Sequence, residues 1–96
     1  MPRLIWSASA ARDMARLHRF LAHKNAEAAR RAVQSIRLGV RNLAAQPQIG
    51  RLAENQKPEF RELIIEFGDS GYITLYHYAD DSVTILAVRH QKEIGC

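Results

Sequence analysis

The four histidines of this 96-residue chain are the first candidates for acid–base or metal chemistry. His18 and His23 are five residues apart, so on a helix their side chains point in different directions. His77 and His90 belong to a later part of the chain, where we expect paired strands to hold them far apart. The spacing therefore predicts no metal site, and we expect the protein to need no cofactor.

A pair made of Arg61 and His90 would suit a nuclease, which needs a proton acceptor near a cation that stabilises phosphate charge. In the register that we expect, Arg61 pairs with Tyr78, and His90 lies near Tyr72 at the other end of the sheet. About six residues at roughly 3.4 Å each separate them by on the order of 20 Å. The sequence also has no phosphate-binding glycine loop and no Ser/His/Asp or Cys/His pattern, so it predicts no catalytic residues.

The stretch from Phe60 to His90 must position these side chains, and it predicts three antiparallel strands. Its apolar runs are rich in Ile, Val, Leu, Tyr and Thr, which suit a pleated surface. The runs are separated by Gly68-Asp69-Ser70-Gly71 and by Ala79-Asp80-Asp81-Ser82, which supply the residues that turns require. Two hairpins follow from this pattern.

Centring each turn on its middle pair sets Phe67 opposite Tyr72, Tyr78 opposite Val83, and Tyr72 opposite Arg89. The face that we expect to pack on helices carries Arg61, Leu63, Ile65, Phe67, Tyr72, Thr74, Tyr76, Tyr78, Val83, Ile85, Ala87 and Arg89. The other face carries Glu62, Ile64, Glu66, Ile73, Leu75, His77, Thr84, Leu86, Val88 and His90. Half of this second set is apolar, which favours a surface that another chain covers; the alternatives are a sheet buried on both faces and a register that is off by one residue.

The first half of the chain predicts one strand and two helices. Arg3–Trp6 is a short apolar run that could add to the sheet, and helical spacing predicts helices over Ala10–His23 and Ala26–Ala45. Asn25 leaves so short a link that the helices must form an antiparallel hairpin. The polar segment that follows predicts an ordered loop. The expected fold class is α+β, with an N-terminal strand, a helical hairpin and a three-stranded antiparallel meander in one domain, residues 1–96.

Charge is divided unevenly along the chain. Residues 1–51 hold ten Lys or Arg against two acids, whereas residues 52–96 hold four against eight. A basic helical half could attract nucleic acid, the ribosome or an acidic protein, or could serve solubility alone. If the partner is an acidic protein, we expect it to contact some of the helical arginines, Arg12, Arg16, Arg30 and Arg37.

The compartment is predicted from what the sequence lacks. No apolar run approaches the roughly 20 residues that a membrane span needs, and the first residues do not resemble a signal peptide. The single cysteine, Cys96, leaves no internal disulfide, which favours a reducing compartment. We therefore expect a cytoplasmic protein with no membrane contact.

Four local strings accompany this order of elements: Ser9-Ala10-Ala11-Arg12-Asp13-Met14, Leu43-Ala44-Ala45-Gln46-Pro47-Gln48-Ile49-Gly50-Arg51, Phe60-Arg61-Glu62-Leu63 and Val88-Arg89-His90. Together they resemble the ParE branch of the RelE/ParE toxin superfamily, the toxin halves of bacterial toxin–antitoxin pairs. The resemblance covers nearly the whole chain. It implies a toxin that a ParD-like antitoxin neutralises, with operator DNA reached only indirectly, through the antitoxin.

The resemblance implies one of two activities, because RelE-like toxins cleave messenger RNA on the ribosome and ParE-like toxins poison DNA gyrase. Where a RelE-like nuclease would have two lysines and an arginine, this chain has Ile64, Glu66 and Ile73, which cannot stabilise phosphate charge. We therefore expect a gyrase inhibitor that is not an enzyme. Arg89 and His90 keep the messenger RNA endonuclease as an alternative, beside a non-toxic regulatory module. The candidate partner-binding residues are Arg12, Arg16, Arg30, Arg37, Ile64, Ile73, Leu86, Arg89 and His90.

Overall fold

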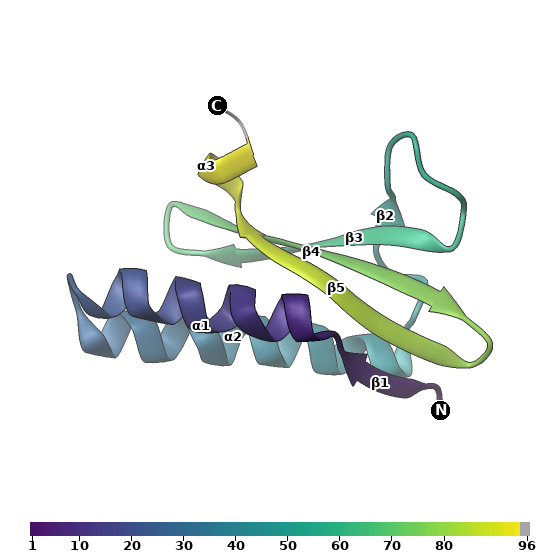
Figure 1. Cartoon of the computed structure of the whole chain (residues 1–96), viewed down its shortest axis with the longest axis horizontal. Helices are drawn as coiled ribbons and strands as arrows, with labels where there is room; N and C mark the ends of the chain where they lie inside the picture. The colour runs from purple at the N-terminus through teal and green to yellow at the C-terminus, as the bar shows by residue number, and fades with distance from the viewer. Residues whose placement is uncertain (95–96) are drawn as a thin grey trace.

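The computed structural model describes residues 1–94 and has a helical hairpin lying along one face of a five-stranded sheet (Figure 1). The elements in chain order are β1 (Arg3–Trp6), α1 (Ala8–Ala22), α2 (Ala26–Ala45), β2 (Arg51–Leu52), β3 (Phe60–Phe67), β4 (Ser70–Ala79), β5 (Ser82–His90) and α3 (Gln91–Ile94). The strand order is β1-β5-β4-β3-β2. This is the predicted α+β arrangement, while the terminal thiol of Cys96 lies outside the described residues.

The helical hairpin forms as the sequence predicts. Ser7 is the N-cap of α1, since its hydroxyl accepts a hydrogen bond from the Ala10 amide at 3.0 Å, and α1 begins two residues earlier than expected. Asn25 caps α2 in the same way, through the Ala28 amide. The bounds of α2 match the prediction, and its buried stripe consists of Ala29, Ala32, Ile36, Val40 and Leu43.

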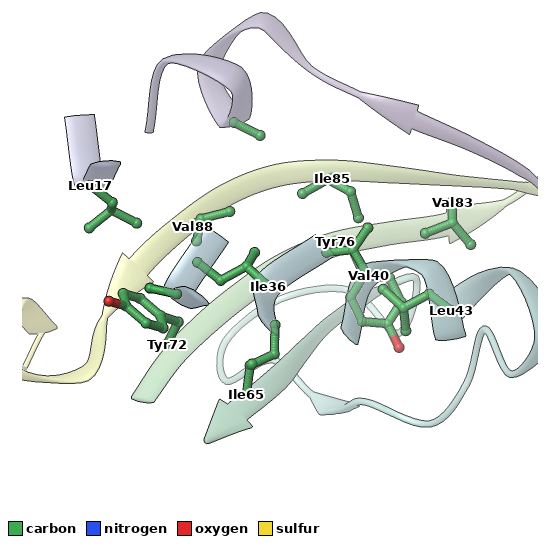
Figure 2. Packing of buried hydrophobic residues seen from close by; sticks show 12 residues of the cluster. Leu17, Ile36, Val40, Leu43, Ile65, Tyr72, Tyr76, Val83, Ile85 and Val88 are labelled. Atoms are coloured by element: carbon green, nitrogen blue, oxygen red, sulfur yellow. The ribbon is translucent and has the colours of Figure 1, made fainter. Parts of the chain in front are cut away.

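The core lies between this stripe and the predicted helix-facing side of the sheet. Figure 2 shows Ile36 and Val40 of α2 facing Ile65, Tyr76 and Ile85 from three different strands. All five are buried. Large apolar side chains packed in this way supply most of the favourable free energy of folding, at about 1.5–3 kcal/mol for each fully buried residue.

The register of the first hairpin differs from the prediction by two residues. The turn is Gly68-Asp69 alone, so Phe67 pairs with Ser70, and Ile65, not Phe67, pairs with Tyr72. Gly68 supplies the positive φ of 62° that so tight a turn requires. Because side chains alternate with a period of two, a slip of two residues leaves every side chain on its predicted face.

A β-bulge breaks the register of the second hairpin. Tyr78 pairs with Val83 as predicted, but the register then shifts and Tyr72 pairs with His90, not with Arg89. One extra residue in β5 reverses the faces beyond the bulge. Val88 is consequently fully buried under the helices, so its prediction for the outer face, like that of His90, is wrong.

The predicted loop is ordered and contains one strand that the sequence did not reveal. β2 pairs with the start of β3, and the Tyr76 hydroxyl anchors the loop by donating to the Pro47 carbonyl at 2.8 Å and accepting from the Gly50 amide at 3.0 Å. The Arg61 guanidinium donates to the Gly50 carbonyl at 2.7 Å. Burial raises the pKa of the Tyr76 phenol, against the Gly50 hydrogen bond and the Arg61 charge, which lower it.

Candidate partner-binding surfaces

A groove of about 600 Å³ runs along the seam between α1 and α2. Small and apolar side chains line it, with cationic and polar groups around them: Ala11, Met14, Ala15, His18, Arg19, Arg30, Val33, Gln34 and Arg37. A second hollow of about 340 Å³ shares Ala11, Met14 and Arg37 with it and reaches Trp6. The hairpin thus has a groove with both apolar and basic side chains, and Arg19, Arg30 and Arg37 form its basic rim.

The rim keeps most of its positive charge. Within residues 1–94, Arg19 and Arg37 make no ion pair, and Arg30 pairs with Glu27 one helical turn earlier. Both partners of that pair are more than half exposed, and exposed pairs contribute little, about 0–1 kcal/mol. A groove of this kind suits an amphipathic segment with acidic residues at its margins.

The four predicted arginines do not lie together. Arg30 and Arg37 share the groove, and Arg12 is exposed on α1 outside the groove lining. Arg16 lines a different, smaller hollow of about 150 Å³, together with Leu17, Phe20, Leu21, Tyr72 and His90. The four arginines are thus divided between two hollows and the exposed surface of α1, and which of them contact a partner stays a prediction.

The outer face of the sheet has an apolar centre with acidic neighbours. Ile64 pairs with Ile73 across β3 and β4, and Ile64 is 42% exposed. Glu66, two residues further along β3, is exposed as well. Leu86 is the half-buried extra residue of the bulge. The outer face therefore offers apolar area and negative charge to a partner.

His90 is held in a hydrogen-bonding role that does not suit a general base. The Lys92 amide donates to Nδ1 at 3.1 Å, so the proton of the neutral ring is on Nε2, which lies 2.9 Å from Ser70 Oγ. In this tautomer Nε2 donates to Ser70 Oγ and the Lys92 amide occupies the lone pair of Nδ1, so both ring nitrogens are engaged within the fold. Arg61 pairs with Tyr76, four residues along β4 from the partner of His90, or about 14 Å, so the two groups remain apart.

Asp13 is a buried functional group that the sequence reasoning missed. Its carboxylate accepts a hydrogen bond from the Val88 amide at 3.0 Å and forms an ion pair with Arg89 at 2.5 Å. Burial alone would raise the pKa of Asp13, but this hydrogen bond and the Arg89 charge outweigh it and hold the pKa below its ordinary value. The available signal was its position, since Asp13 interrupts the buried stripe between Ala10 and Leu17.

Two site classes are absent from the described part of the chain. Among residues 1–94, no group of three or more His, Cys, Asp or Glu side chains lies close enough together to hold a metal ion. None of the helices over the same residues is long and apolar enough to cross a bilayer.

Comparison with known proteins identifies the family. Residues 4–95 match the family model described as the ParE toxin of the type II toxin–antitoxin system, parDE. Toxin RelE3 of Caulobacter vibrioides is 34% identical over 84 residues, which is 88% of each chain.

Two solved structures share the fold over almost the whole chain. A chain of the chromosomal ParDE system from P. aeruginosa superposes with a TM-score of 0.76 at 26% identity, covering 94% of this chain and 96% of that one. A chain of the toxin–antitoxin complex RelBE2 from Mycobacterium tuberculosis gives 0.59 at 25% identity, with 95% and 100% covered. From the extent of these matches, the chain belongs to the ParE toxin family of type II toxin–antitoxin systems.

Proposed function

We propose that this toxin acts by binding and inhibiting DNA gyrase, without enzymatic activity of its own. The observation that carries the proposal is the composition of the outer sheet face, where Ile64, Ile73 and Glu66 occupy the surface that a ribosome-dependent nuclease would need for cations. Cleavage of RNA requires stabilisation of extra charge at phosphorus, and losing one such contact costs about 2.7–4 kcal/mol. A carboxylate at this surface would repel that negative charge and destabilise it.

The two late residues that would favour a nuclease are already engaged in the fold. Arg89 lies in an ion pair with Asp13, and the His90 ring receives the Lys92 amide on Nδ1. A nuclease would have to break these contacts before either group could reach a substrate. The ribosome-dependent endonuclease nevertheless stays as the second candidate, because the curated relative at 34% identity is named Toxin RelE3.

The proposed partner is a ParD-like antitoxin that places an acidic amphipathic segment in the groove between α1 and α2. The apolar lining and the rim arginines Arg19, Arg30 and Arg37 support this choice. Operator DNA is reached through the antitoxin and not by the toxin itself.

Two assays on purified toxin separate the candidate activities. We expect inhibition of gyrase supercoiling, or accumulation of gyrase cleavage complexes, and no cutting of messenger RNA on translating ribosomes. Gyrase inhibition should survive His90→Ala. Codon-phased cleavage that His90→Ala abolishes, with no effect on gyrase, would instead establish the nuclease.

The antitoxin contact has its own test. Arg37→Glu reverses a rim charge and should weaken binding of the antitoxin encoded next to the toxin gene by about tenfold or more, since each 1.4 kcal/mol is tenfold. Arg41→Glu is the matched control, because Arg41 is exposed on the same helix but does not line the groove. Equal binding by the two variants would exclude the groove as the contact.

A further inference from the structure

One edge of the sheet is left open along β3. β2 is two residues long and pairs only with Arg61 and Glu62. The remaining residues of β3, 63–67, have no strand on that side within the described chain. In Figure 1, β2 lies at the end of β3 away from the β3–β4 hairpin, so the open stretch is the half that leads into the hairpin.

The phase of the backbone hydrogen bonds identifies which groups face outward. The Ala53 amide donates to the Phe60 carbonyl at 3.1 Å, so Phe60 turns its backbone toward β2. Backbone groups alternate along an antiparallel strand, so Ile64 and Glu66 turn their N–H and C=O groups in the same direction. Ile65 and Phe67 face β4 and complete that ladder. No backbone hydrogen bond within residues 1–94 reaches the outward groups of Ile64 or Glu66.

The surroundings of this edge are apolar on one side and acidic on the other. A hollow of about 270 Å³ adjoins Ile64 and is lined by Ile49, Gly50, Arg51, Glu62 and Leu63. Ile49 is 54% exposed. Glu62 is neutralised by Arg51, whereas Glu66 is exposed and makes no ion pair in the described part of the chain.

We propose that an extended segment of the antitoxin adds here as a sixth strand, pairing with Ile64 and Glu66 of β3. This inference rests on the proposed function, because it takes the antitoxin as the partner. The outward backbone groups supply the hydrogen bonds, and the side chains select the sequence. The added strand has an apolar residue beside Ile64 and a lysine or arginine beside Glu66, because opposite charges on neighbouring strands are stabilising.

A second copy of the toxin fits this edge less well. Antiparallel pairing of two β3 strands about Ile65 would set Glu66 of each copy against Ile64 of the other. Neither carboxylate would then receive a cation, and desolvating an unpaired charge is costly. Charge complementarity therefore favours the basic segment of a different chain.

Hydrogen exchange tests the proposal on the unmodified toxin and its complex with the antitoxin. The amides of Ile64 and Glu66 should exchange quickly in the free toxin and at least about 100-fold more slowly in the complex. The amides of Ile65 and Phe67 are the internal reference and should be protected in both states. If the complex forms and Ile64 and Glu66 still exchange quickly, strand addition is wrong while the antitoxin partnership stands.

Substitution of the outward amide gives an independent measurement. Ile64→Pro removes a donor that faces the edge and should weaken antitoxin binding by about five- to tenfold, the equivalent of one hydrogen bond. Ile64→Val retains the N–H and should bind like the parent. Protection of Ile64 that rises with toxin concentration alone would identify a second copy as the occupant and overturn the proposal. Failure of any antitoxin to bind would overturn the proposal together with the partner on which it rests.

Discussion

The two outer edges of the sheet differ in how far their backbone groups are hydrogen-bonded. On one side, β1 pairs with β5 from Ser82 to Ile85. Beyond the end of β1, two side chains of the α1 region form hydrogen bonds with the β5 backbone. The Ser7 hydroxyl donates to the Leu86 carbonyl at 3.4 Å, and the Asp13 carboxylate accepts from the Val88 amide at 3.0 Å. On the other side, β2 ends after two residues and the rest of β3 stays open.

The difference shows that this fold can close an edge with side chains where no strand is present. The β5 edge is therefore part of the folded core, whereas the β3 edge is guarded by the charge of Glu66 alone. Charged residues on an exposed edge are a common protection against uncontrolled strand pairing. An edge that is protected by charge but not covered by a strand can still pair with a strand of a partner protein.

The largest expected effect comes from a proline at a position of β3 whose backbone N–H points toward β4. Ile65→Pro removes an inward hydrogen bond and a buried side chain, so it should cost more than about 3 kcal/mol and abolish or nearly abolish folding. Ile64→Pro removes an outward donor and a side chain that is 42% exposed, and should cost about 1 kcal/mol. Urea denaturation of the isolated toxin measures both. Similar losses for the two variants would contradict the assignment of outward and inward amides.

Removing the side chain that closes the β5 edge should have the next largest effect. Asp13→Ala leaves the Val88 amide buried without its acceptor and Arg89 without its partner, which should cost about 2 kcal/mol. This expected loss is smaller than that for a fully buried ion pair, because Arg89 is partly exposed. Asp69→Ala, at the exposed turn of the β3 hairpin, is the matched control and should change the free energy of unfolding by less than about 0.5 kcal/mol.

The same carboxylate predicts a pH dependence of stability. The folded-state pKa of Asp13 is lowered from 3.8, so its stabilising contribution is fully present above about pH 4 and is lost as the pH falls through the folded-state pKa. The difference in unfolding free energy between the parent and Asp13→Asn should therefore shrink as the pH is lowered from 6 toward about 2.5. A difference that is constant over this range would show that the charge of Asp13 is not what stabilises the edge.

The smallest effect on stability is expected at the guarding residue. Glu66→Thr removes the charge, keeps a side chain suited to a strand and should alter the free energy of unfolding by less than about 0.5 kcal/mol. It should nevertheless increase self-association of the isolated toxin, which sedimentation velocity can measure as a function of concentration. Glu66→Asp is the control that keeps the charge. A Glu66→Thr variant that stays monomeric would show that something other than charge protects the edge.

Local signals in the sequence were sufficient for the long helices, for the four longer strands and for most of the core. Ser7 and Asn25 are N-caps because their short polar side chains reach backbone amides within one turn, an interaction contained in a few neighbouring residues. The faces of β3 and β4 were also predictable, because alternation tolerates the two-residue error that the first turn introduced. Arg30 and Arg37 line the same groove because residues seven apart lie on one face of a helix.

Contacts between segments that are distant in the chain could not be predicted from local sequence patterns. The bulge that brings Val88 and His90 to the helix-facing side depends on how β5 fits both β4 and α1, and nothing in the local pattern marks it. β2 is two residues long and lies in a loop that the distant Tyr76 and Arg61 side chains anchor.

The sequence by itself determined the two long helices and the four longer strands, most of the core, and that the outer sheet face lacks the cations of a nuclease. These properties follow from short-range periodicity and residue chemistry. Only the tertiary structure decided that Asp13 closes the β5 edge, 75 residues away in the chain, and that Ile64 and Glu66 are left open. The physical reason is that a backbone hydrogen bond is satisfied by whatever group the completed fold brings within reach, and sequence separation does not record that distance.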